Sequence, residues 1–492
     1  MKRMKIISII LIICTMFLSS GTASMALDYG DYLNSTVEFM QDMYYQSMTD
    51  TESFKAALKG IFGNLDPYSG FFDDEESKQL NMSLEGNFVG IGASLEKCDE
   101  GILIIKVYED SPAEKAGLCE GDIILGVDGV PAVGRDADIV ATEIRGDAGT
   151  RVTLTIKRQS DIMDITIVRG LVVVNPVEFR FEGETAYIHI DTFNSNTAEK
   201  FGEAMDAVAR MRTTKILLDL RDNPGGFVDQ AVAVAKRIIP KGLITELDFK
   251  SERLTDMSYY STLESSPYII AVLVDENTAS ASEILASAIQ DAGNGILVGQ
   301  KTYGKGVVQN MFSVITPEAY AKYHDQYGVG YITDIEWMVY HGVFPTTDEI
   351  LGTIKLTTGN YLTRNGKEIQ GIGINPDIKV EDRTNPNGID ISLIDGLANN
   401  TGNLALNAYD EGVYQAERIL KAAGYFTGAP DRLLDVETKT ALKKFQTDEK
   451  LNASGEINST TRDKLNELLK DLRVKNDPQY TKALDFLRSF KK

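Results

Sequence analysis

Histidine and cysteine, which supply many catalytic and metal sites, are scarce in this sequence of 492 residues. There are three histidines and three cysteines. No H-E-x-x-H segment is present, which excludes the usual helical zinc-hydrolase site, and no G-x-S-x-G segment supports a Ser-His-Asp triad. Beyond the first 26 residues only Cys98 and Cys119 remain, so a disulfide-stapled fold is excluded, and whether these two pair stays open.

Positive charge is also in short supply. Lys and Arg total 50 against 72 Asp and Glu, which gives a formal net charge of −22 at pH 7. A surface of this sign repels polyphosphate, so nucleic acid is not expected as a partner. The composition, 43% hydrophobic and 25% charged, is that of a globular protein. The length indicates roughly three to four domains.

Long apolar runs are limited to the N-terminus. Residues 6–18 are largely apolar, follow the positive Lys2, Arg3 and Lys5, and precede the small-residue segment Ser24-Met25-Ala26. This order is typical of a secretory signal over the first 26 residues. Because the run is too short to cross a bilayer comfortably, a retained anchor is the weaker alternative. We therefore expect a secreted protein.

The rest of the chain divides into regions with different patterns. Residues 27–83 repeat apolar side chains at helical spacing, whereas residues 84–170 combine glycine-rich turns with alternating strands. Residues 171–381 alternate short buried strands with helices, which predicts a parallel β-α-β sheet and a multidomain α/β fold class. The last three regions are an Asn-, Asp- and Gly-rich linker, a small helical domain and a terminal helix: residues 382–408, 409–470 and 471–492.

One segment carries a candidate nucleophile. Residues 275–284 take an apolar strand through small residues into a helix, with Ser280 at the junction. That geometry presents a hydroxyl at the end of a sheet and points the first backbone N–H groups of the helix outward. The alternative is an ordinary N-cap, since Ser and Thr are common at helix starts. Ser282 is a second candidate nucleophile in the same segment.

A second segment supplies a candidate base. Lys305 stands between Gly304 and Gly306 at the start of an apolar strand, where glycines let another element approach closely. A lysine is usually solvated, but a desolvated lysine has a lowered pKa and can accept a serine proton. This is the Ser-Lys form of nucleophilic catalysis, and Gln309 could orient the amine.

The two segments together resemble the carboxyl-terminal processing (tail-specific) serine protease family. They read T-A-S-A-S-E-I at 278–284 and T-Y-G-K-G-V-V-Q at 302–309. The resemblance extends over most of the mature chain through four further segments, at 65–69, 220–226, 356–361 and 371–377. It implies a crotonase-like (ClpP-like) protease core and no metal or cofactor. Family members often dimerise through terminal helices, which residues 28–60 and 471–492 could supply in a homodimer.

The resemblance also implies roles for individual residues. The family's serine-to-lysine spacing selects Ser280 rather than Ser282 as the nucleophile. Lys305 is then the general base, and Gln309 holds the lysine. The backbone N–H groups of Gly226 and Ala281 form the oxyanion hole: the pair that stabilises the negative oxygen of the tetrahedral intermediate.

Residues 84–170 resemble a PDZ domain inserted into the protease. Gly90-Ile91-Gly92-Ala93 stands at the carboxylate-binding loop, so Ile91, Gly92 and Ala93 are expected to bind the C-terminus of a peptide that adds as a strand to a sheet edge. The alternative is that these glycines only form a tight turn. Arg145 lies where the family joins the PDZ domain to the protease, and we hypothesise that it reports peptide arrival; a solvated surface arginine is the alternative.

Two further regions bear on partners. Residues 409–470 resemble a small three-helix peptidoglycan-binding module, with a bare helical bundle as the alternative, so peptidoglycan is an expected partner. Residues 313–349, which include Tyr320, Tyr323 and Trp337, form an insertion where the family connects two strands more directly. The insertion could cap the cleft, bind a partner or pack without a role.

These features and the resemblances predict a secreted serine endopeptidase, associated with the bacterial cell envelope, that recognises the C-termini of protein substrates through its PDZ domain and cleaves with a Ser-Lys dyad. The competing hypothesis is a catalytically inert scaffold that binds peptides and the wall. A peptidoglycan hydrolase, suggested only by the peptidoglycan-binding module (the wall module), ranks last because zinc ligands and a paired-carboxylate signature are both missing.

Overall fold

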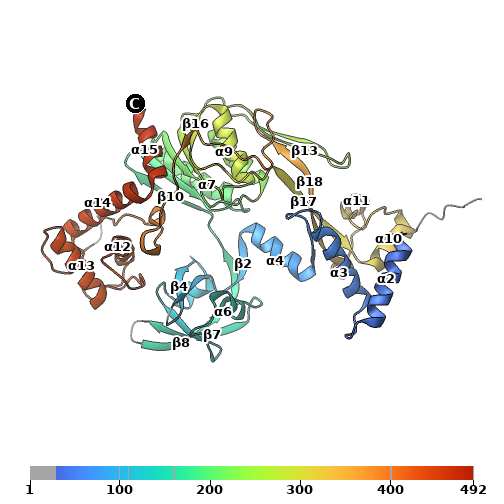
Figure 1. Cartoon of the computed structure of the whole chain (residues 1–492), viewed down its shortest axis with the longest axis horizontal. Coiled ribbons are helices and arrows are strands. Elements are labelled where there is room, and N and C mark those ends of the chain that lie inside the picture. The colour runs from blue at the N-terminus through green and yellow to red at the C-terminus, as the bar shows by residue number, and fades with distance from the viewer. Residues whose placement is uncertain (1–28, 99, 109, 159–160, 399–401, 491–492) are drawn as a thin grey trace, which may run out of the picture.

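The computed structural model describes residues 29–98, 100–108, 110–158, 161–398 and 402–490, drawn in colour in Figure 1. The predicted secretory signal lies outside these ranges. Within them, no helix combines the length and apolar character needed to cross a bilayer. The N-terminal helices and the C-terminal helical module lie at opposite ends of the molecule, with the protease region and the PDZ domain between them (Figure 1).

A six-stranded sheet forms the centre of the protease region. Only its first pair is antiparallel, and the remaining pairs run parallel as the alternating pattern predicts. Its strands follow the order β10 (Val177–Glu182), β11 (Thr185–Ile190), β12 (Lys215–Asp219), β15 (Ile269–Val274), β16 (Gly295–Gly299) and β19 (Ile378–Lys379).

Both faces of this sheet are buried, but by helices from different parts of the chain. Alternate residues such as Ile216 and Leu218 face a core that includes α7 (Thr197–Arg210), α8 (Val228–Ile238) and α9 (Ala281–Ala292). The residues between them, such as Leu217, pack instead on the terminal helix α15. This helix spans Pro478–Ser489, and its Tyr480, Ala483, Leu484 and Leu487 are buried. A parallel sheet needs cover on both faces, and here the last helix supplies half of it.

A second sheet is antiparallel and carries the strands that follow Lys305. Its members are β1 (Gly70–Asp73), β13 (Gly242–Phe249), β14 (Met257–Ser261), β17 (Val307–Ile315) and β18 (Ile350–Leu362). β17 and β18 pair along nearly their whole length, and β1 pairs with the other edge of β18. This pairing brings the strand of Gln309 beside the N-terminal region of the chain.

Two helical excursions border the second sheet. The N-terminal region folds mainly as expected into α2 (Tyr29–Met43), α3 (Asp50–Gly63) and α4 (Asp74–Glu85), interrupted by strand β1. The insertion forms α10 (Pro317–Tyr327) and α11 (Ile335–Tyr340) around a small core of its own. Tyr323 and Met338 are buried in that core, so the insertion is a packed unit.

The PDZ region is an independent β-rich unit joined to the protease by a ribbon of two strands. The ribbon pairs β2 (Asn87–Gly90) with β9 (Gly170–Val173). The domain's own elements are β3 (Ala93–Cys98), β4 (Gly101–Val107), α5 (Pro112–Lys115), β5 (Ile123–Val127), β6 (Val130–Pro131), α6 (Ala137–Ile144), β7 (Arg151–Arg158) and β8 (Asp161–Val168). Cys98 and Cys119 are both half-buried free thiols.

The C-terminal module is a three-helix unit with its own core. Its helices are α12 (Glu411–Ala422), α13 (Val436–Asp448) and α14 (Ser459–Asn476). Ile391, Ile394 and Leu397 from the expected linker are buried in this core, because two short 3-10 helices, Pro386–Gly388 and Ile391–Leu393, fold that segment against the bundle. α14 also runs past the expected boundary at residue 470, so the terminal helix begins only at Pro478.

Candidate active site

Ser280 occupies a constrained position at the start of α9. The chain leaves strand β15 at Val274 and enters the helix at Ala281, as the sequence predicts. Ser280 has φ +58° and ψ −119°, a left-handed backbone conformation that is unfavourable for a side chain with a Cβ. Strain of this kind persists only where the surroundings enforce it, and it is concentrated at functional sites.

Gly225 lies directly against Ser280, and the next residue, Gly226, lies against Phe193. A Cβ atom added to Gly225 would lie 2.8 Å from Ser280 Cβ and 2.7 Å from the carbonyl oxygen of Ala279. A Cβ added to Gly226 would lie 2.3 Å from the carbonyl oxygen of Phe193. Both glycines also have positive φ angles, +100° and +141°. Only glycine permits this approach of the 220–226 loop to Ser280.

Two backbone N–H groups near Ser280 donate no hydrogen bond within the described residues, although the neighbouring amides of the same segments do. In the loop, the amides of residues 220–223 and of Gly225 all donate hydrogen bonds, and Pro224 has no amide hydrogen. Around Ser280, the amides of residues 277–280 and of Ser282 also donate. Within the described residues, the amides of Gly226 and Ala281 have no acceptor. These are the two groups assigned to the oxyanion hole from the sequence.

Lys305 is partly desolvated and its amine is unpaired. Its Nζ lies over the ring of Tyr68, 4.6 Å from the centroid, and it forms no hydrogen bond or ion pair with the described residues. Burial lowers the pKa of Lys305 below its ordinary value, and the positive charge of Lys355 lowers it further. The negative charges of Asp66 and Glu283 act in the opposite direction. The net direction favours the neutral amine that a general base requires.

Glu283 ties the serine and lysine segments together. Its side chain is fully buried. Oε2 accepts hydrogen bonds from the amides of Ser280 and Lys305, both at 2.9 Å. Oε1 accepts from the Gly304 amide at 2.8 Å and from the Thr302 hydroxyl at 2.6 Å. Burial raises the pKa of Glu283, while these four donors act in the opposite direction. One carboxylate therefore sets the position of both candidate catalytic residues.

Tyr361 on β18 adds a second bridge between the same two segments. Its hydroxyl lies 2.6 Å from the carbonyl oxygen of Lys305 and 3.1 Å from that of Ser280, and donates to this pair. The residue is buried, and burial raises its pKa well above the ordinary value, so it remains a neutral donor. Neither Glu283 nor Tyr361 was among the residues predicted from the sequence. The capping-box spacing of Ser280 and Glu283, three residues apart, was a usable signal for the first.

The side chains of the expected triad are not hydrogen-bonded to one another. Within the described residues, no hydrogen bond links Ser280 Oγ, Lys305 Nζ and the Gln309 amide. Gln309 Nε2 lies 3.3 Å from Thr357 Oγ1 and 3.5 Å from the carbonyl oxygen of Val307. Ser282, the rival nucleophile, is buried and donates to the carbonyl oxygen of Asn223 at 3.1 Å. Its hydroxyl is thus engaged inside the fold.

In the PDZ region, the expected carboxylate loop leads into an edge strand. β3 follows Ile91 and Gly92 and pairs on one side only, with β4, while α6 packs near it. Gly92 has φ +82°, and an added Cβ would lie 2.3 Å from Ser111 Cβ, so this turn requires glycine. Ala93 opens the strand. An unpaired edge beside a helix is the geometry that strand addition by a peptide needs.

Arg145, the expected reporter of peptide arrival, is exposed at the end of α6, with no side-chain hydrogen bond or ion pair in the described part of the chain. A different arginine holds the end of this helix. Arg169 is buried and donates to the carbonyl oxygens of Ile144 and Arg151 at 2.7 and 2.9 Å.

Across the described ranges, no group of three or more His, Cys, Asp or Glu side chains is placed to hold a metal ion.

Three family models match the chain. Residues 184–380 match peptidase family S41, residues 103–158 match a PDZ domain, and residues 409–465 match a peptidoglycan binding domain. The PDZ and wall-module expectations are thereby confirmed at the level of the domain family. The peptidase match confirms the expected serine-type peptidase, while the roles of individual residues stay predictions.

Curated relatives match almost the whole chain. A probable CtpA-like serine protease of Staphylococcus epidermidis is 31% identical over 490 residues, covering 98% of this chain and 91% of the relative. One of Staphylococcus aureus is 31% identical over 464 residues, covering 93% and 84%. Among solved structures, the photosystem II D1 C-terminal processing protease is 22% identical, with a TM-score of 0.40, covering 70% of this chain and 86% of that one.

Proposed function

The chain belongs to peptidase family S41, and on that premise we propose that this serine peptidase uses Ser280 as nucleophile and Lys305 as general base. The observation that carries the proposal is the pair of free amides at Gly226 and Ala281, on two segments whose neighbouring amides all have acceptors. Donors left open beside a strained serine can stabilise an oxyanion without reorganising during the reaction.

The proposed reaction is acyl transfer. Ser280 Oγ attacks the carbonyl carbon of the scissile peptide as its proton passes to the neutral amine of Lys305. The carbonyl oxygen becomes negative and accepts hydrogen bonds from the two free amides. Collapse of the intermediate breaks the C–N bond, and the leaving amine takes the proton from Lys305. Water then attacks the acyl-enzyme with the same base, which releases the acid and restores Ser280.

The free enzyme is proposed to hold its base side unassembled. Within the described residues the Lys305 amine has no hydrogen bond to Ser280 Oγ, so this contact forms when substrate binds, and Gln309 then accepts from the amine through its Oε1. The backbones of Ser280 and Lys305 already share Glu283 and Tyr361, which ties the two segments together before that step. Catalytic hydrogen bonds often tighten only when substrate is bound.

We assign substrate selection to the PDZ domain, which is proposed to bind the C-termini of protein substrates. The edge of β3 and the turn at Gly92 can receive a terminal carboxylate and add the peptide as a strand. We further propose that the C-terminal module binds peptidoglycan, which places the enzyme outside the cytoplasm at the cell envelope. The apolar N-terminal run, typical of a secretory signal, agrees with that location.

A homodimer is proposed through the N-terminal helices. α2 has no buried residue, and Tyr29, Phe39 and Tyr45 are 78%, 66% and 84% exposed. Large aromatic residues gathered on one uncovered helical arm indicate an interaction surface. Sedimentation of the full chain at micromolar concentration tests this, because a monomer at every concentration contradicts it.

The catalytic proposal is tested with a quenched fluorescent peptide that ends in a free carboxylate. Ser280→Ala and Lys305→Ala are each expected to lower kcat by about 10⁴-fold or more, as for other nucleophile and base deletions. Ser282→Ala is the matched control and is expected to retain most of the activity, because its hydroxyl is engaged with Asn223. Equal cleavage by the wild type and Ser280→Ala would reject the dyad, and an inactive wild type would indicate the inert scaffold.

A further inference from the structure

The loop that carries the Gly226 amide contains a fully buried arginine. Arg221 is 1% exposed. Its Nε and Nη2 donate to the two carboxylate oxygens of Asp219, at 2.9 and 2.6 Å. Asp219 ends strand β12 and also accepts a hydrogen bond from the Tyr187 hydroxyl at 2.8 Å. One side of the guanidinium is therefore fixed to the central sheet.

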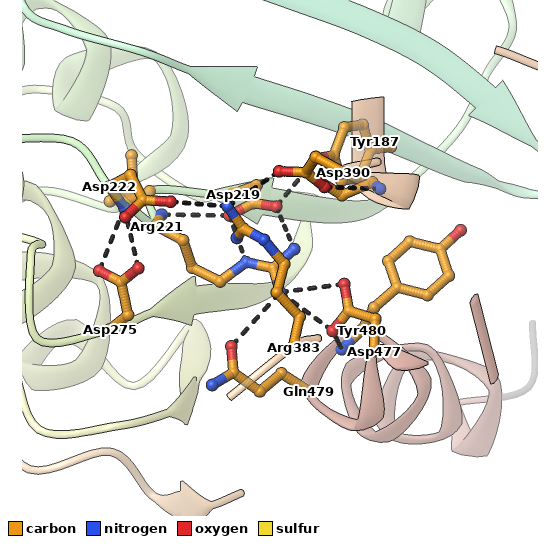
Figure 2. A network of polar contacts seen from close by, with 12 residues as sticks. Tyr187, Asp219, Arg221, Asp222, Asp275, Arg383, Asp390, Asp477, Gln479 and Tyr480 are labelled. Carbon is orange, nitrogen blue, oxygen red and sulfur yellow. Dashed lines mark hydrogen bonds and ion pairs between the residues drawn. The ribbon is translucent and has the colours of Figure 1, made fainter. Parts of the chain in front are cut away.

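The other side of Arg221 is fixed by the C-terminal helix. Arg221 Nη1 lies 3.0 Å from both carboxylate oxygens of Asp477 and 3.4 Å from Gln479 Oε1 (Figure 2). Asp477 is 1% exposed and caps α15 by accepting from the Tyr480 amide at 2.9 Å. Two residues that are 256 positions apart in the sequence thus join the start of α15 to the loop beside Ser280.

The next residue of the loop is held from the same part of the chain. Asp222 has φ +59°, a conformation that needs support from its neighbours. Its carboxylate accepts from Arg383 Nη2 at 2.6 Å and from Asn277 Nδ2 at 2.7 Å, while its amide donates to Asp275. Arg383 lies just after the last strand of the central sheet. Two successive loop residues therefore depend on groups that follow the protease core.

We propose that Asp477, at the start of α15, and Arg383 are positioning residues for the oxyanion hole. This inference rests on the proposed function. Neither residue lies in a matched domain, since the peptidase match ends at residue 380 and the wall-module match covers 409–465. Asp477 acts through Arg221 and Arg383 acts through Asp222, and both fix the path of the chain into Gly226.

A contribution to the stability of the fold does not by itself explain why a buried carboxylate stands at Asp477. The apolar residues of α15, with Leu484 and Leu487 buried against the sheet, already hold the helix in place. A buried ion pair adds little net stability, because removing two charges from water offsets most of their attraction. Breaking one partner, in contrast, leaves an uncompensated charge at the base of the loop. A small shift of the Gly226 amide would then weaken the transition state more than substrate binding.

The test is Asp477→Asn in the full-length chain, because asparagine can still cap α15 but does not carry the charge that faces Arg221. We expect kcat to fall about tenfold with KM within about twofold of wild type. The affinity for a peptide aldehyde, whose adduct oxygen occupies the oxyanion hole, should fall by the same factor. The affinity of the PDZ domain for a C-terminal peptide should not change.

Leu487→Ala is the matched control on the same helix, since it removes packing without touching the network. It should lower the unfolding temperature and leave kcat within about twofold when assayed at a temperature where the chain is folded. The inference is overturned by wild-type kcat and aldehyde affinity in Asp477→Asn, or by an equal loss of kcat in Leu487→Ala.

A second variant carries the test if Asp477→Asn does not fold. Arg383→Met breaks the contact with the exposed Asp222 carboxylate and should lower kcat about threefold to tenfold with KM unchanged. Wild-type kcat in this variant overturns the inference. A wild-type chain without Ser280-dependent cleavage would instead overturn the proposed function, so the two failures are distinguishable.

Discussion

The two sides of the candidate site are held in different ways. On the oxyanion side, the amides from Leu220 to Gly225 all have acceptors, apart from Pro224, and buried ion pairs anchor the loop from both directions. On the base side, the Lys305 amine lies over the Tyr68 ring and has no hydrogen bond or ion pair in the described part of the chain, and Gln309 lies against Thr357. In the proposed mechanism, the half that stabilises charge is complete before substrate arrives, whereas the half that moves protons is completed by a rearrangement.

This difference separates two jobs that a regulated protease must perform. Preorganised donors are effective only if they stay in place, since reorganisation during the reaction would consume their benefit. A base that is unassembled in the free enzyme limits cleavage of unselected proteins, because binding of the correct ligand must complete the site. Variants that change one side of the site at a time test whether the two sides differ in this way.

Apart from removal of the nucleophile or the base, the largest effect is expected on the preorganised side. Gly226→Ala places a Cβ 2.3 Å from the Phe193 carbonyl oxygen, so the backbone must move and the amide must leave its position. We expect kcat to fall by about 10²–10³-fold, the usual effect of losing one oxyanion donor. Steady-state kinetics measure the loss, and retained PDZ-peptide binding confirms a folded chain. Wild-type turnover in this variant would remove Gly226 from the site.

How much of this site could be predicted from the sequence depends on how local each signal is. Ser280 and Lys305 stand out because small residues or glycines surround each of them within one short segment. The parallel sheet follows from alternating strands and helices for the same reason. Glu283 was detectable only as half of a capping box with Ser280, and its second role, binding the Lys305 amide, requires the folded chain.

Contacts between residues far apart in the sequence could not be predicted from any local pattern. Asp477 is one acidic residue among 72, and nothing near it in the chain indicates a partner 256 residues away. Residues 382–408 have the composition of a linker, yet Ile391 and Ile394 are fully buried. Their apolar side chains fall in a short run, residues 389–397, between segments rich in Asn, Asp and Gly, so tertiary packing and not a long local pattern decides their place.

An intermediate effect is expected from Gln309 on the unassembled side. If Gln309 orients Lys305 only after substrate binds, Gln309→Ala should lower kcat about tenfold and leave the unfolding temperature of the free enzyme nearly unchanged. Ser313→Ala, at an exposed position on the same strand, is the matched control. A large loss of stability without a loss of kcat would indicate that Gln309 acts only through its contact with Thr357.

The smallest effect concerns the charge around the base. Lys355 lowers the pKa of Lys305, so Lys355→Met should raise that pKa and decrease the neutral fraction at a given pH. Because activity rises with pH as the amine loses its proton, the rising limb of kcat/KM should move to higher pH. Asp66→Asn removes a charge that raises the pKa of Lys305, so its limb should move the other way. A pH profile that neither variant displaces would show that a group other than Lys305 controls it, and the base side would need a different assignment.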